Sequence, residues 1–184
     1  MRFGEIDVIR GLAVVGMVIY HLLVDLEMFW GMKIGVYEFP IVLLARVVGV
    51  TFIFLLGVSA SLQFEKSKSA KIFLERGLIL WFWALVITGV TYVIFPDQFI
   101  YFGILHFMGS ALILLIPLTK IKSNGFLFGI GLGIIWLGLI VKMDVRSTMD
   151  FYPLIPWMAL VIWGFWAGKR YLKWRKGKEF KMKN

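Results

Sequence analysis

The sequence predicts an all-α polytopic membrane protein, a six-transmembrane-helix bundle with both termini in the cytoplasm. Its 184 residues are 60% hydrophobic and 17% charged, and the mean hydropathy is +0.87. A soluble domain is usually about 45–50% apolar and about 25% charged. Apolar segments of roughly bilayer length recur along the chain, and basic residues gather in alternate links between them. These observations exclude a disordered chain and an ordinary water-soluble domain.

Six apolar segments predict the transmembrane helices. They are Ile6 to Met28, Ile41 to Leu62, Gly77 to Phe95, Phe102 to Leu118, Phe126 to Val141 and Pro153 to Gly168. The links between them are short, so neighbouring helices should pack antiparallel. No linker is long enough to divide the chain. We therefore expect one transmembrane domain over residues 1–168, followed by a basic cytoplasmic tail over residues 169–184.

Lysine and arginine predict the orientation of the bundle. Most of them fall at Arg2, in the stretches 66–76 and 120–122, and in the tail 169–183, whereas the opposite links hold Lys33, Lys142 and Arg146. By the positive-inside rule both termini are cytoplasmic and the protein is a multi-pass protein of the cell membrane. Orientation explains most of the net charge of +9, and the tail is expected to touch anionic lipid headgroups. Nucleic acid is not an expected partner.

The first span carries a stripe of ionisable side chains. Asp7, Arg10, His21 and Asp25 fall within a sector of about 60° at 100° per residue. Each charge costs about 2.5–3.5 kcal/mol at the centre of a membrane helix, so the stripe should face the bundle interior or a water-filled passage. For Asp7 and Arg10 the alternative is a structural pair at i,i+3. An aspartate one turn from His21 can orient the ring and raise its basicity.

Two further polar residues belong near the outer ends of their spans. His106 is expected about one turn below the outer surface, at a depth close to that of His21, and the alternative is a core histidine with its hydrogen bonds satisfied. Arg46 is either an interfacial anchor or the cation of an anionic pocket. Ser59 and Ser61 are expected to be hydroxyls in helix packing.

The composition also limits the possible chemistry. The absence of cysteine excludes disulfides and a thiol nucleophile. Two histidines with one nearby aspartate are too few to predict a metal site. Gly125, Gly129 and Gly133 recur every four residues, a spacing typical of close helix packing, either within the bundle or in a homodimer.

Four motifs, in order along nearly the whole chain, resemble the heparan-alpha-glucosaminide N-acetyltransferase catalytic-domain family. They are Asp7-Val-Ile-Arg10-Gly11 with Gly16-Met17-Val-Ile-Tyr-His21, then Phe52-Ile-Phe-Leu-Leu-Gly57-Val-Ser59, Phe102-Gly103-Ile-Leu-His106-Phe-Met-Gly109 and Tyr152-Pro153-Leu-Ile-Pro156-Trp157. The resemblance implies that an acyl group is carried from cytoplasmic acyl-CoA, with acetyl-CoA as the expected co-substrate, to an extracytoplasmic sugar or other amine or hydroxyl. The well-characterised animal members are longer and have an essential histidine in the loop after the first span. Residues 29–40 hold no histidine, so that role falls to His21 or His106, or the activity differs.

The resemblance suggests a role for each candidate. Asp7, Arg10, Arg46 and Arg76 are the candidate substrate- and donor-binding residues, with Lys66, Lys68, Lys71 or Arg76 near the phosphates of the donor. One histidine would act as general base or transient acyl carrier. Asp25 would orient His21, and Arg46 could stabilise the oxyanion.

Two other classes of function fit the same stripe. A proton-coupled transporter also uses intramembrane Asp, Arg and His, although the chain shows no inverted repeat or broken helix pair. A non-catalytic membrane assembly subunit would suit the small size and the spaced glycines.

Overall fold

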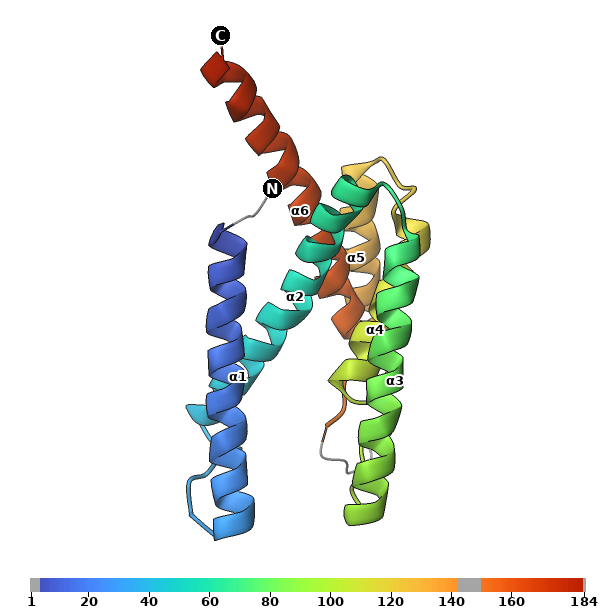
Figure 1. The fold of residues 1–184 in the computed structure, drawn as a ribbon. Coiled ribbons are helices and arrows are strands. Elements are labelled where there is room, and N and C mark those ends of the chain that lie inside the picture. Colours follow the sequence, from blue (N-terminus) through green and yellow to red (C-terminus); the bar gives the residue numbers. More distant parts are fainter. Residues whose placement is uncertain (1–3, 142–149, 184) are drawn as a thin grey trace. The chain divides into compact units, whose positions relative to one another are not determined.

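The computed structural model describes residues 4–141 and 150–183, and in these residues the chain forms six α-helices (Figure 1). The helices are α1 (Gly4–Trp30), α2 (Ile41–Ser67), α3 (Lys71–Ile94), α4 (Ile104–Leu118), α5 (Asn124–Ile140) and α6 (Leu154–Lys183). The predicted all-α class is confirmed, and each predicted span falls on one helix. By length and composition α1, α2 and α3 can cross a membrane, while α4 and α5 are shorter apolar helices. Arg2, Lys142 and Arg146 lie outside the described residues.

The chain divides within α2 into two compact units, Met1–Leu55 and Leu56–Asn184. The first, unit 1, contains α1, the link 31–40 and the first half of α2. The second, unit 2, contains the rest of α2 and helices α3 to α6.

In unit 1 a small residue allows α1 to approach α2. A Cβ atom added at Gly16 would lie 2.8 Å from the Cγ2 atom of Val48 on α2, so glycine permits a close crossing there. The link folds back onto α1 because the Glu27 carboxylate accepts hydrogen bonds from the N–H groups of Gly35 (2.7 Å) and Val36 (3.2 Å). The φ of Gly35 is +74°, a left-handed conformation that glycine adopts without strain.

Unit 2 is built from two pairs of packed helices, α3 with α4 and α5 with α6. Gly77 of α3 and Gly109 of α4 face each other, because a Cβ atom on either would lie 2.9 Å from the carbonyl oxygen of the other. Gly131 of α5 lies against the Trp163 indole of α6. Small residues thus set the helix separation, as is usual in membrane bundles.

The second half of α2 packs on α6 through small residues as well. Gly57 lies against the Val161 carbonyl, and Gly168 lies against Ser61. Ser61 is 2% exposed, and its hydroxyl donates to the Val58 carbonyl oxygen at 2.9 Å. The predicted packing role of Ser61 is confirmed.

The predicted glycine face of α5 is open within the described part of unit 2. Within the described residues, no atom outside the helix lies within 4 Å of a Cβ atom added at Gly125, Gly129 or Gly133. The contact to α6 is made by Gly131 instead. Of the two packing alternatives for this spacing, only the homodimer needs the open face, and it stays a prediction.

Helix α6 continues without a break through the predicted boundary between Gly168 and Lys169, as far as Lys183. Its first turn is kinked at Ile155, where φ is −103° and ψ is 128°. The proposed tail therefore begins as a helical extension of the last apolar helix.

Candidate active site

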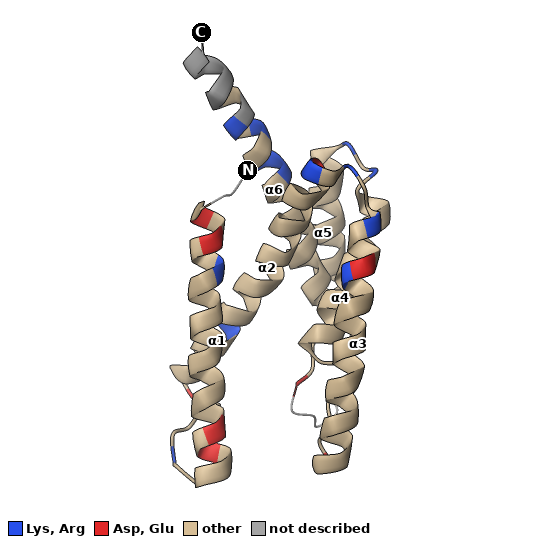
Figure 2. Ribbon diagram, viewed as in Figure 1, with Lys and Arg blue, Asp and Glu red and all other residues tan. Residues whose placement is uncertain are grey.

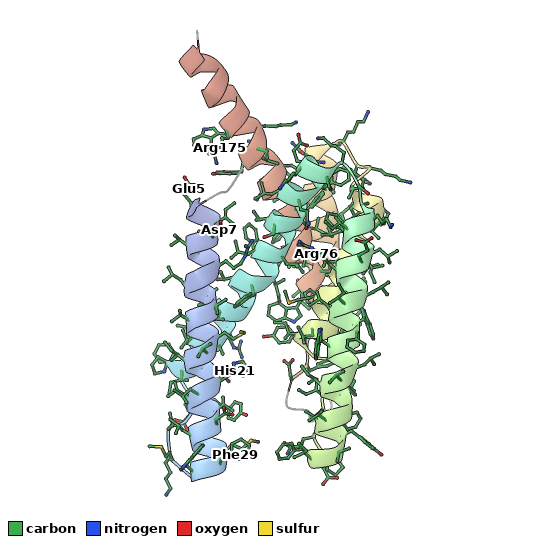
Figure 3. The ribbon with its side chains drawn as sticks, viewed as in Figure 1. Glu5, Asp7, His21, Phe29, Arg76 and Arg175 are labelled. Atoms are coloured by element: carbon green, nitrogen blue, oxygen red, sulfur yellow. The ribbon has the colours of Figure 1, made fainter. Side chains whose placement is uncertain are left out.

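The ionisable stripe of α1 lies on the side of the helix that α2 leaves uncovered within unit 1. Asp7, Arg10, His21 and Asp25 are all exposed, and Figure 3 shows the His21 side chain projecting from α1. Gly16, which faces α2, is about 180° around the helix from Asp7. The buried residues Ile6 and Ala13 lie about 40° and 60° from Arg10, the nearest member of the stripe, on the side toward Gly16. The polar face is thus free of the helix packing inside its own unit.

Asp7 and Arg10 form the i,i+3 pair that was one of the two sequence interpretations. The Arg10 guanidinium lies 3.3 Å from the Asp7 carboxylate, and the two side chains are 44% and 55% exposed. Such an exposed pair contributes about 0–1 kcal/mol in water. Asp7 also adds a negative charge to the first turn of the helix, where the helix dipole favours it.

His21 has a defined tautomer. Its Nδ1 lies 2.9 Å from the carbonyl oxygen of Met17, one turn earlier in α1. A carbonyl only accepts, so Nδ1 must carry the proton and donate it. In the neutral ring Nε2 then keeps the lone pair. The exposed imidazole, with Tyr20 edge-on at 5.9 Å, therefore presents a basic nitrogen on the stripe.

Asp25 is predicted to orient the His21 ring, and the contact that the structure shows is to the backbone. The Met17 carbonyl oxygen accepts the hydrogen bond from Nδ1. Among the described residues no hydrogen bond or ion pair joins Asp25 to the ring. The backbone thus fixes the ring, and Asp25 lies one turn further along α1 as an exposed carboxylate.

His106 has both ring nitrogens engaged inside unit 2. Its Nδ1 accepts the N–H of Gly103 at 3.3 Å, so Nε2 carries the proton and donates to the Thr88 hydroxyl at 3.4 Å. Thr88 in turn donates to the Ile100 carbonyl oxygen at 2.6 Å. The ring is 2% exposed, with Trp81 edge-on at 5.0 Å and Phe102 stacked at 5.6 Å. This is the geometry of a satisfied core histidine.

Asp150 is a residue of this region that the sequence did not single out. Its Oδ2 accepts the N–H of Ile104 at 2.7 Å, so it caps the N-terminus of α4 beside Gly103. The same segment is held by a hydrogen bond from the Tyr152 N–H to the Phe102 carbonyl oxygen. Because 46 residues separate Asp150 from Ile104, no local pattern could reveal the contact.

The other two predicted arginines, Arg46 and Arg76, and the basic links lie near helix ends. Arg46 is exposed on α2 of unit 1. Arg76 is exposed near the start of α3 in unit 2 (Figure 3). Lysines of the α2–α3 link are already paired, since Lys68 lies 2.6 Å from Glu65 and Lys71 lies 3.6 Å from Glu75. Figure 2 shows basic residues gathered at this end of unit 2.

Lys169 ties α6 to the α4–α5 link at the same end of unit 2. Its ammonium group donates to the Ile121 carbonyl oxygen at 2.8 Å and lies 5.7 Å from the Phe165 ring. Burial, and then the charge of Lys173, lower the pKa of Lys169, while Glu65 opposes the shift.

The link of unit 1 contains a hollow of about 450 Å³, lined by Glu27, Gly31, Met32, Lys33, Ile34, Gly35 and Glu38. Glu27 lies about 120° around α1 from His21, so this hollow and the stripe occupy different sides of the helix.

Five of the predicted residues therefore lie in unit 1, namely Asp7, Arg10, His21, Asp25 and Arg46. The other two, His106 and Arg76, lie in unit 2. A passage shared by the two histidines stays a prediction. Among the described residues, no three His, Cys, Asp or Glu side chains are grouped to hold a metal ion.

An all-helical chain with long apolar helices and a polar stripe on one of them defines a membrane protein. The sequence model described as "Heparan-alpha-glucosaminide N-acetyltransferase, catalytic" matches residues 2–184, and the chain belongs to this family. The resemblance inferred from the four motifs is thereby confirmed. The family is that of a membrane acetyltransferase domain. No curated protein and no solved structure gives a significant match.

Proposed function

We propose that the protein is a six-span membrane acyltransferase with both termini in the cytoplasm, in which His21 is the general base. It would move an acetyl group from cytoplasmic acetyl-CoA to an amine or hydroxyl, such as that of a sugar, outside the membrane. The observation that supports this is the tautomer of His21, which leaves Nε2 with a lone pair on the uncovered stripe of α1. Membership in an acetyltransferase family supports the reaction class.

The chemistry would follow from that nitrogen. Nε2 accepts the proton of the acceptor N–H or O–H while the acceptor atom attacks the thioester carbonyl carbon. While Nε2 holds this proton, the hydrogen bond from Nδ1 to the Met17 carbonyl has a charged donor and is stronger. The C–S bond then breaks, and Nε2 passes the proton to the departing CoA thiolate, so that His21 ends the cycle neutral.

Charged residues of the same unit would assist at the two ends of the stripe. Asp25, one turn from His21, would stabilise the imidazolium that forms. Arg46 would face the oxyanion of the tetrahedral intermediate, a contact often worth several kcal/mol when preorganised. Asp7 and Arg10, already paired at 3.3 Å, would line the cytoplasmic mouth.

The donor would dock by its phosphates at the cytoplasmic end. Arg76 and Lys66 are exposed and would face the cytoplasm in the predicted orientation, whereas Lys68 and Lys71 each have a glutamate partner. Arg76 is thus the cation that we assign to the donor phosphates, since guanidinium groups bind them in a bidentate fashion. His106 would hold the start of α4 in place.

The test is acetyl transfer by the purified full-length chain with labelled acetyl-CoA and a panel of amino sugars. His21→Gln should lower the rate about 10²–10⁴-fold, and Arg76→Gln should raise the KM for acetyl-CoA with little change in kcat. His106→Gln is the matched control, because it replaces a histidine in the other unit. Equal loss in both histidine variants, or none in His21→Gln, would reject His21 as the base.

A further inference from the structure

The C-terminal part of α6 carries aromatic and basic side chains on one face. Trp166, Arg170, Lys173 and Trp174 fall within a sector of about 100° at 100° per residue. Arg170 and Lys173 are exposed, and Trp174 is 56% exposed. The Arg170 guanidinium lies 5.4 Å from the centre of the Trp166 ring, a cation–π contact between neighbouring turns of the helix.

The neighbouring side of the same helix packs into the bundle, and Trp166 itself contacts the Phe128 ring of α5 at 5.4 Å. Phe165 is 1% exposed, and Lys169 is held by the Ile121 carbonyl oxygen. Phe165 lies roughly 130° and Lys169 roughly 90° around the helix from the centre of the aromatic-basic face. Packing inside unit 2 therefore explains Phe165 and Lys169, but it does not explain an exposed tryptophan beside two exposed cations.

The position of this face along α6 indicates its surroundings. It begins where the buried apolar run ends, since Val161, Ile162 and Phe165 are each at most 1% exposed and cations begin at Lys169. Tryptophan is enriched where a membrane helix leaves the hydrocarbon, and cations just beyond that level meet the phosphates of the headgroups. Between Phe165 and Arg175 the sequence has no acidic residue, so no neighbour in the segment neutralises these charges.

We propose that the face formed by Trp166, Arg170, Lys173 and Trp174 binds the headgroup of an anionic phospholipid. The indole rings would lie at the level of the glycerol backbone, and Arg170 and Lys173 would contact the phosphate oxygens. This site is separate from acyl transfer and does not depend on the proposed function.

The experiment uses the full-length protein in a neutral detergent, titrated with short-chain phosphatidylglycerol or phosphatidylcholine and followed by native mass spectrometry. A cation near an anionic surface contributes about fivefold in affinity, so Arg170→Gln with Lys173→Gln should weaken phosphatidylglycerol binding about 30-fold. The matched control is Lys120→Gln with Lys122→Gln, which removes two exposed cations at the same end of unit 2 and should change binding less than threefold. Phosphatidylcholine should bind both variants and the native protein alike.

Two results would overturn the proposal. One is phosphatidylglycerol affinity in the Arg170/Lys173 variant within threefold of the native value. The other is an equal loss in the control variant, which would indicate diffuse charge in place of a site. Helix content by circular dichroism confirms that the variants are folded, and if the double variant unfolds, Lys173→Gln alone should lose about fivefold. Because acetyl-CoA binding is measured in parallel, a failed lipid site and a failed acyltransferase give different results.

Discussion

Replacing His106 tests whether this histidine stabilises the fold or takes part in the reaction. His106→Leu removes the acceptor of the Gly103 N–H and the donor to the Thr88 hydroxyl. Both hydrogen bonds are made by a buried side chain, since His106 is 2% exposed. A buried donor left without its partner costs about 1–3 kcal/mol. In a chain of this length about 1 kcal/mol lowers the melting temperature by roughly 2–4 °C. His106→Leu should therefore lower the melting temperature in detergent by roughly 2–12 °C.

His106→Gln is the decisive companion variant. His106 is the third residue of α4, and its ring reaches back to the N–H of Gly103 at the N-cap. Glutamine at this position makes the same backward hydrogen bond in the capping box of many helices. We expect His106→Gln to stay within about 1 kcal/mol of the native stability and to keep acetyl transfer within a few-fold. A stable His106→Gln protein whose transfer rate falls by 10²-fold or more would refute this reasoning and make His106 the base.

Three further predictions concern other contacts. Asp150→Ala leaves the Ile104 N–H without its 2.7 Å acceptor and should cost about 0.5–2 kcal/mol in thermal unfolding; an unchanged melting temperature would contradict the cap. Gly109→Leu should lower the free energy of unfolding by about 1–3 kcal/mol, because its Cβ would meet the Gly77 carbonyl oxygen at 2.9 Å. Gly129→Leu should leave stability unchanged and weaken the homodimer predicted for the open face of α5, as measured by crosslinking. Burial lowers the pKa of Lys169 from 10.5. Between the folded pKa and 10.5 the unfolded chain therefore binds more protons than the folded chain, and the free energy of unfolding should rise with pH. Lys169→Met should abolish that rise, and an identical pH profile of stability in both proteins would contradict the lowered pKa.

The sequence was sufficient for the helices and for the polar stripe. Apolar length and helical period depend only on local composition, which is why each expected span falls on a helix and why Asp7 and Arg10 are found as an i,i+3 pair. The glycine contacts were predicted less well. The spacing of Gly125, Gly129 and Gly133 was visible, but the glycine that meets α6 is Gly131, because the partner helix decides which face is covered.

The candidate site was predicted only in part, because its hydrogen bonds depend on contacts distant in sequence. Asp25 lies one turn from His21 as expected, yet a backbone carbonyl of the same helix occupies Nδ1. Asp150 and Thr88 reach the start of α4 from other segments of unit 2. One signal in the sequence did point to the environment of His106, namely its position three residues after Gly103, a spacing typical of a capping residue.

The two histidines differ because of the backbone group that each can reach. Inside a helix every N–H is used, so the ring of His21 meets the Met17 carbonyl one turn back and must present a protonated Nδ1. In the first turn of a helix the N–H groups are unpaired, so His106 meets the Gly103 N–H and must present a bare Nδ1. His21 can therefore take a second proton at Nε2 and keep its backbone hydrogen bond. His106 would have to place that proton on Nδ1, against an N–H donor, and would lose the contact that caps α4. Protonation during turnover thus keeps the backbone hydrogen bond of His21 but would break that of His106. The base is therefore assigned to His21 on α1.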